Sequence, residues 1–109
     1  MAAISHDDFK KVDIRIVKVI EAEKVLGKTK ILKLIIDIGS GETRTIIAGG
    51  AEYYTPEYFS GKKFVALINL PSRKIAGIDS QGMLLAADTG PKPIWLIADG
   101  DAPIGARVM

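Results

Sequence analysis

Cysteine is absent from this chain of 109 residues, which also contains only one histidine, one asparagine and one glutamine. The lack of cysteine excludes disulfides, thiolate zinc sites and cysteine nucleophiles. Any metal ion would have to be held almost wholly by carboxylates beside His6, which is weak support for a metal site. We therefore predict neither a metal nor a cofactor, and the missing cysteine favours a cytoplasmic location.

Long apolar runs are missing as well. No segment approaches the ~18 apolar residues that a membrane-spanning helix needs. The first residues include His6, Asp7 and Asp8, where a signal peptide would have its apolar centre. We therefore expect no membrane partner. The length predicts one domain over residues 1–109 that buries enough surface to fold unaided.

Charge is distributed unevenly along the chain. The net charge is only +2, but thirteen of the fifteen basic residues lie at or before Lys74, against nine of the thirteen acidic ones. The run from Lys24 to Lys33 contains four lysines and no acid. A local positive patch attracts phosphate groups even on a nearly neutral protein. A solvated lysine face explains this run equally well.

Three fragments that suggest catalysis or ligand binding do not fit those roles. Gly27-Lys28-Thr29 lacks the earlier glycine of a P-loop, because Ala22 occupies that position, and a strand-like segment follows it. Ser80 has neither a GxSxG elbow nor a second histidine to activate it. The residues around His6 are typical of a helix start, capped by Ser5 or Asp7, with Phe9 on the core. We predict no catalytic residue.

Most of the chain has the period-two alternation of β-strands. We expect strands at residues 12–21, 31–38, 42–48, 63–70 and 83–87. The first changes its facing pattern midway, which predicts a bulge. Thr55, Pro56 and Gly61 mark a short helix between the third and fourth strands. This order predicts an all-β fold, a five-stranded Greek-key OB barrel over about residues 9–88, with a C-terminal dimerisation extension over about 89–109.

Aromatic residues gather around the short helix. We predict that Phe59 and Tyr58 plug the open end of the barrel, and we leave Tyr53 open between core packing and stacking on bases. Trp95 lies in the apolar run 94–97. We expect Trp95 to pack on a partner subunit or on its own barrel, because an exposed run of this kind promotes aggregation.

The segment NLPSRKIAGIDSQGM, residues 69–83, holds the lone asparagine and the lone glutamine near its two ends. After Pro71 ends the ladder, we expect Arg73 and Lys74 to leave the sheet together and bind phosphate. Hydroxyl and amide groups in the segment can contact ribose or unpaired base edges, and a methionine offers an adaptable apolar surface. A basic structural turn is the alternative. The predicted RNA-binding residues are Asn69, Arg73, Lys74, Ser80, Gln81 and Met83, with Lys33, Arg44 and Lys62 as flanking phosphate contacts.

The pattern N-L-x-x-R-K-x-x-G-x-x-S-x-G-M in this segment closely resembles the signature of the tRNA-binding OB domain of methionyl-tRNA synthetases and stand-alone tRNA-binding proteins. Similar stretches are Asp8-Phe9, residues 12–15, residues 34–39, Pro56-Glu57 and Gly61-Lys62.

The resemblance implies a non-catalytic homodimer that recognises the shape of tRNA. It also implies the role of a beta subunit or accessory domain of methionyl-tRNA synthetase, with the synthetase catalytic chain as a candidate partner. The loop at Val25–Ile31 departs from the family's His-Pro-x-Ala-Asp-Lys, so contacts of that loop cannot be transferred. A secretion chaperone that binds peptides on the same barrel is the alternative, and Ser80-Gln81-Gly82-Met83 favours tRNA.

Overall fold

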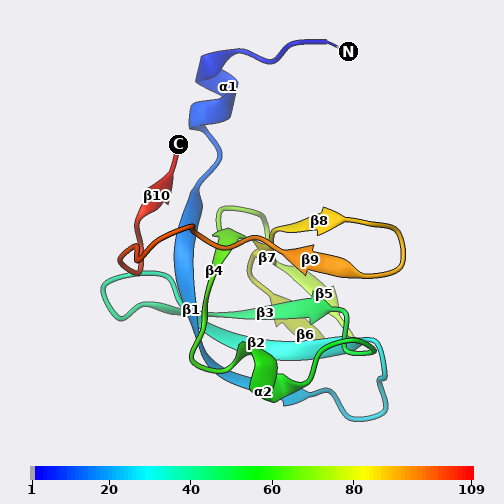
Figure 1. Ribbon diagram of the computed structural model, residues 1–109. Coiled ribbons are helices and arrows are strands. Elements are labelled where there is room, and N and C mark those ends of the chain that lie inside the picture. Colours follow the sequence, from blue (N-terminus) through cyan, green and yellow to red (C-terminus); the bar gives the residue numbers. More distant parts are fainter. Residues whose placement is uncertain (1) are drawn as a thin grey trace.

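Five strands of a six-stranded antiparallel sheet, curled into a barrel, form the body of the computed structural model, which describes residues 2–109 (Figure 1). Its strand order is β3-β2-β1-β4-β7, and the short helix α2 lies between β3 and β4 in sequence. This arrangement confirms the predicted OB-type barrel. The elements are β1 (Ile14–Lys24), β2 (Ile31–Asp37), β3 (Thr43–Gly49), α2 (Pro56–Phe59), β4 (Lys63–Leu67) and β7 (Met83–Leu84).

Alternation of apolar residues builds the core as the sequence predicts. On β2, Leu32, Leu34 and Ile36 are buried, while Lys33 and Asp37 lie on the outer face. The predicted bulge is present in β1, where the register with β2 shifts between Val19 and Glu21. A bulge bends a strand and increases its twist, which lets the long β1 pair with β4 along one half and β2 along the other.

Helix α2 closes one end of the barrel with an aromatic cluster. Phe59 is fully buried and its ring centroid lies 5.5 Å from that of Phe64 and 5.6 Å from that of Trp95. The predicted plug is therefore confirmed for Phe59, and Trp95 packs on its own barrel. Tyr58 and Tyr53 are exposed at the rim. Thr55 occupies the expected N-cap position, although its side chain makes no capping hydrogen bond.

The N-terminal helix α1 (His6–Lys10) begins as predicted. The Ser5 hydroxyl accepts a hydrogen bond from the Asp8 N–H at 3.0 Å, which satisfies one free amide of the first turn. The expectation that Phe9 lies on the core is wrong. Phe9 is 39% exposed, because α1 stands off the barrel, and Phe9 lines a groove between α1 and the C-terminal residues.

The predicted fifth strand, residues 83–87, is split into two. Only β7 pairs with β4, whereas β8 (Ala86–Asp88) pairs with β9 (Pro93–Trp95) in a separate hairpin. The chain then crosses the barrel and ends in β10 (Arg107–Val108), which pairs with the start of β1. Part of the C-terminal extension thus belongs to the same sheet, paired with the first residues of β1 (Figure 1). Neither helix in residues 2–109 is long and apolar enough to cross a membrane.

The aromatic plug generates a stability prediction. Phe59→Ala should lower the free energy of unfolding by about 3–5 kcal/mol, because it leaves a cavity among Tyr54, Phe64 and Trp95. Urea denaturation measures the change. Tyr53→Ala, at an exposed aromatic position, is the matched control and should cost less than about 1 kcal/mol. Equal losses in the two variants would contradict the plug.

Candidate nucleic-acid interface

The segment that the sequence predicts as a basic loop is a β-hairpin. Strand β5 (Arg73–Ile75) pairs with β6 (Ile78–Ser80), and Ala76-Gly77 makes the two-residue turn. Both turn residues have positive φ, 52° and 79°, as a type I′ turn requires. Glycine adopts this conformation without strain, which explains Gly77.

The two basic residues of the hairpin point to opposite faces. Side chains alternate along a strand, and the register places Arg73 beside Ser80 and Lys74 beside Asp79. Arg73 and Lys74 thus leave the main sheet together, as expected, but their side chains do not share a face. Lys74 Nζ lies 3.6 Å from an Asp79 carboxylate oxygen across the hairpin, whereas Arg73 is exposed and has no ion-pair partner within residues 2–109.

A groove of about 480 Å³ runs between the hairpin and the outer face of β3. Arg73 lies in its lining, and Met83 contributes a side chain that is 46% exposed. The remaining lining is mostly apolar. It comes from Ile47, Leu70, Pro71, Ser72, Ile75, Ser80 and Gly82. A guanidinium beside apolar surface suits a phosphate next to a ribose or base face.

Ser80 and Gln81 hold the hairpin to the free edge of β3. Ser80 Oγ accepts a hydrogen bond from the Ile47 N–H at 3.0 Å, and the side chain of Ser80 is buried. Gln81 makes two bonds to Thr45, donating its N–H to the carbonyl and accepting with Oε1 from the N–H. The Ser80 hydroxyl thus serves the closure of the barrel, and the direct RNA contact expected of Ser80 stays a prediction.

Asn69 anchors the other end of the segment. Its Oδ1 accepts from the Asp13 N–H at 2.8 Å, and its Nδ2 donates to the Lys11 carbonyl at 2.6 Å. Arg44 acts nearby, donating from Nη1 to the Ile68 carbonyl and from Nη2 to the Glu42 carboxylate. Asn69 and Arg44 were both predicted to contact RNA. These groups instead hold the backbone that precedes the hairpin.

Asp13 links this anchor to the start of β1. A hydrogen bond from Arg15 is the main cause that lowers the pKa of Asp13, burial opposes it, and the charges of Arg107 and Arg44 add to it. Because the folded pKa lies below the ordinary value, this stabilisation is present above a pH of about 4 and is lost as the pH falls below it.

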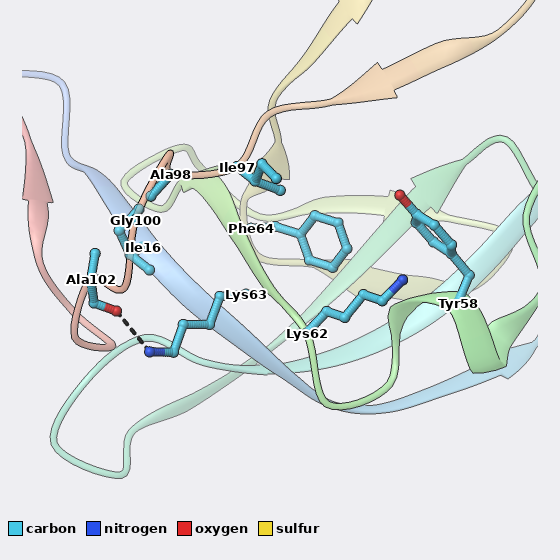
Figure 2. A pocket seen from close by; sticks show the side chains of 9 residues that line it. All are labelled: Ile16, Tyr58, Lys62, Lys63, Phe64, Ile97, Ala98, Gly100 and Ala102. Atoms are coloured by element: carbon cyan, nitrogen blue, oxygen red, sulfur yellow. Dashed lines mark hydrogen bonds between the residues drawn. The ribbon is translucent and has the colours of Figure 1, made fainter.

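The remaining predicted residues lie apart. Lys33 is on the outer face of β2, opposite Ile47, with its ammonium 3.6 Å from Glu23. Lys62 precedes β4, is absent from the lining of the hairpin groove, and its ammonium lies 3.7 Å from the centre of the Tyr58 ring. Figure 2 shows Lys62 pointing toward Tyr58 beside a separate pocket of about 320 Å³, which the C-terminal residues Ile97 and Ala98 also line.

Sequence reasoning missed the apolar half of the groove. The sequence analysis assigns Ile47 and Leu70 to strands and gives them no role in the site. The alternation on β3 nevertheless places the Ile47 side chain on the outer face, away from the buried Ile46 and Ala48. No group of three or more potential metal ligands occurs within residues 2–109.

Comparisons with known proteins agree with this geometry. The family model for a tRNA binding domain matches residues 14–107. A methionine–tRNA ligase of Thermotoga maritima is 54% identical over 106 residues, which cover 97% of this chain. The chain belongs to the tRNA-binding domain family. That alignment covers only 17% of the ligase, so the chain spans about a sixth of the length of the curated relative.

Two solved structures share the whole fold of this family member. A methionyl-tRNA synthetase-related protein of Pyrococcus horikoshii superposes with a TM-score of 0.90 at 40% identity, covering 100% of both chains. The chaperone CsaA of Bacillus anthracis superposes with a TM-score of 0.88 at 27% identity, covering 99% of this chain and 100% of the chaperone.

The anchoring role of Ser80 can be separated from ligand binding. Ser80→Ala should lower the free energy of unfolding by about 1–3 kcal/mol, because the Ile47 N–H loses its acceptor at a buried site. Arg73→Ala, at an exposed position that makes no ion pair among residues 2–109, should change stability by less than about 0.5 kcal/mol. Urea denaturation compares them, and an unchanged Ser80→Ala midpoint would contradict the anchor.

Proposed function

We propose that this chain is a non-catalytic tRNA-binding module that holds folded tRNA on the groove between the hairpin and β3. The observation that supports this most is Arg73, a solvent-facing guanidinium on a hairpin whose two ends are fixed by Asn69 and Gln81. A preorganised donor fork loses little conformational entropy when it binds phosphate, so its binding energy is largely retained.

This proposal assigns direct RNA contacts to fewer residues than the sequence analysis predicted. Arg73 binds phosphate, Met83 supplies apolar surface in the groove, and Lys33 adds charge on the neighbouring strand. Lys74 and Lys33 contribute less than Arg73, because the carboxylates of Asp79 and Glu23 lie 3.6 Å from their ammonium groups and partly neutralise them. The predicted residues Asn69, Arg44, Ser80 and Gln81 position the groove, and Lys62 lies outside it.

The partners follow from the family. We propose that the chain works in the cytoplasm as a beta subunit or accessory domain for a methionyl-tRNA synthetase catalytic chain, to which it adds tRNA affinity. The support is the likeness to one part of a methionine–tRNA ligase and to the full length of a methionyl-tRNA synthetase-related protein. The aminoacylation chemistry would then reside on the other chain.

We also propose a homodimer formed through the C-terminal extension. Ile94, Leu96 and Ile97 are exposed by 44%, 41% and 67% on the segment that follows β8. Apolar side chains grouped in this way mark an interaction surface rather than a solvated one. Two copies would present two basic grooves to a single RNA, so that weak contacts combine.

A peptide-binding chaperone is the second candidate, supported by the likeness to CsaA and by the pocket in Figure 2. That pocket combines Phe64, Ile97 and the rim residue Tyr58, which suits an apolar peptide side chain. Because it lies away from the hairpin, competition discriminates: a chaperone should hold peptide in the presence of excess tRNA and bind tRNA poorly.

Substitution of Arg73 tests the proposed groove. Arg73→Ala should weaken tRNA binding about tenfold or more, since hydrogen bonds to charged groups contribute about 1.5–3 kcal/mol. Arg73→Lys should restore part of the affinity through charge without the planar fork. Filter binding at several salt concentrations measures both, and the log–log salt slope should fall by about 0.7–0.9 for one lost phosphate contact.

Lys18→Ala serves as the matched control, because Lys18 is an exposed residue of β1 outside the groove. It removes the same charge and should leave binding nearly unchanged. If Arg73→Ala binds tRNA like the unmodified chain, the groove assignment is wrong.

Assembly has its own test. Sedimentation equilibrium should give twice the chain mass of 11.7 kDa, and Ile97→Asp should shift the protein toward monomer by placing a charge in the apolar contact. Lys18→Asp, at an exposed position of β1 outside the C-terminal extension, is the charge control and should remain dimeric. A monomer at all concentrations would remove the homodimer.

A further inference from the structure

The stretch that joins α1 to β1, residues 10–13, which we call the linker, is held by a side chain of the C-terminal strand β10. Arg107 Nη2 donates hydrogen bonds to the Lys10 carbonyl at 2.9 Å and to the Val12 carbonyl at 3.0 Å. Figure 1 shows β10 along the first residues of β1, away from the hairpin strands β5 and β6. Arg107 is also absent from the lining of the hairpin groove. A residue of the C-terminal extension thus fixes the backbone that leads into the barrel.

Arg107 and Asn69 meet across a single peptide group of the linker. The Val12 carbonyl accepts a hydrogen bond from Arg107, and the Asp13 N–H of the same peptide donates to Asn69 Oδ1 at 2.8 Å. A trans peptide is planar, and its C=O and N–H point in opposite directions. The two side chains therefore lie at opposite edges of one rigid unit, which passes a displacement of one edge to the other.

The hydrogen bonds of Arg107 are directed at the protein, although its side chain is 46% exposed. Its Nη2 carries two hydrogens, and the two linker carbonyls accept from that nitrogen. Its Nε lies 4.0 Å from Asp13 Oδ1, and Arg15 donates to both oxygens of that carboxylate at 3.0 and 2.9 Å. Holding the linker accounts for these contacts better than a direct contact with phosphate does.

Asn69 is the last fixed point of the chain before the hairpin. No backbone–backbone hydrogen bond from Leu70, Pro71 or Ser72 occurs among residues 2–109. The next paired residue is Arg73, at the start of β5. All four of these residues line the groove. The position of this groove wall therefore depends on where Asn69 is held.

We propose that Arg107 is a positioning residue for tRNA binding, which sets the wall of the hairpin groove through the shared peptide group and Asn69. This inference rests on the proposed function. It goes beyond it by giving the C-terminal strand a part in RNA binding without a contact to the RNA. The extension and the groove are thereby coupled, so that a displacement of β10 changes the affinity for tRNA. Substitutions within such a coupled network change an affinity by about two- to thirtyfold.

The first test compares the unmodified whole chain with Arg107→Ala in filter binding of unfractionated tRNA at several salt concentrations. The variant should bind more weakly by about two- to thirtyfold. The log–log salt slope should stay the same, because no phosphate contact is lost. A slope smaller by about 0.7–0.9 would show that Arg107 itself binds a phosphate, and it would overturn the positioning role.

Lys10→Ala is the matched control. It removes one charge from an exposed side chain that lines the same groove at α1 as Arg107, and it leaves the Lys10 carbonyl in place. It should bind tRNA like the unmodified chain. An equal loss in the two variants would show a general charge effect and overturn the proposal.

A double-mutant cycle tests the route through Asn69. Asn69→Ala and Arg107→Ala interrupt bonds to the same peptide group, so their effects on tRNA binding should not add. The double variant should bind little more weakly than the weaker of the two single variants. Additive losses would mean that the two residues act separately, and they would overturn the shared route.

Hydrogen exchange followed by NMR tests the clamp without RNA. The Asp13 amide should exchange faster in Arg107→Ala than in the unmodified chain, whereas the Val19 amide, which donates to the Lys62 carbonyl, should not change. Arg107→Lys keeps a long donor without the planar fork, so it should show smaller changes in the same direction. The lysine variant carries the test if the alanine variant does not fold. Unchanged exchange at Asp13 would contradict the clamp.

The remaining outcomes separate this inference from the proposed function and from assembly. If Arg73→Ala weakens tRNA binding while Arg107→Ala binds like the unmodified chain, the positioning role is wrong and the tRNA function stands. If the unmodified chain does not bind tRNA, the proposed function falls and this inference falls with it. Sedimentation equilibrium should give the same mass for Arg107→Ala as for the unmodified chain. A change of mass would assign the loss of binding to assembly and overturn the positioning role.

Discussion

The free edge of β3 is the constraint on which the rest of this structure depends. Within residues 2–109, β2 is the only strand that pairs with β3, and an open edge exposes N–H and C=O groups that must find partners. Here the Ser80 hydroxyl at Ile47, and the carboxamide and backbone N–H of Gln81 at Thr45, take the place of a strand. These bonds hold the hairpin beside β3 without making it part of the sheet. A groove therefore lies between the hairpin and β3, where a continuous sheet would leave none.

Fixing the hairpin by side chains separates two tasks within one short segment. Asn69 and Gln81 turn their polar groups toward the protein and fix the backbone, while the Arg73 side chain stays exposed. Under the proposed function, a polyanion would meet a hairpin whose backbone is already fixed, so that binding adds little backbone ordering cost. The pairing of Lys74 with Asp79 also keeps the hairpin from carrying an unbalanced charge on its other face.

Periodicity and composition predicted the barrel, the bulge in β1, the helix between β3 and β4 and the aromatic plug, because each follows from local burial patterns. The rarity of carboxamides directed attention to Asn69 and Gln81. It did not predict that their side chains bond to the backbone of the protein. Whether an amide faces solvent or backbone depends on contacts over 56 and 36 residues of sequence, which no local pattern carries. The opposite facing of Arg73 and Lys74 was missed for a local reason, because the hairpin turn at Ala76-Gly77 was not recognised.

Trp95 has a practical consequence for studying this protein. It is the only tryptophan in the chain and packs against Tyr54 and Phe59 where the C-terminal extension meets the barrel. Indole emission shifts to longer wavelength when water reaches the ring, so intrinsic fluorescence reads one junction without any label. Detachment of the extension would redden that signal even with the strands of the barrel intact.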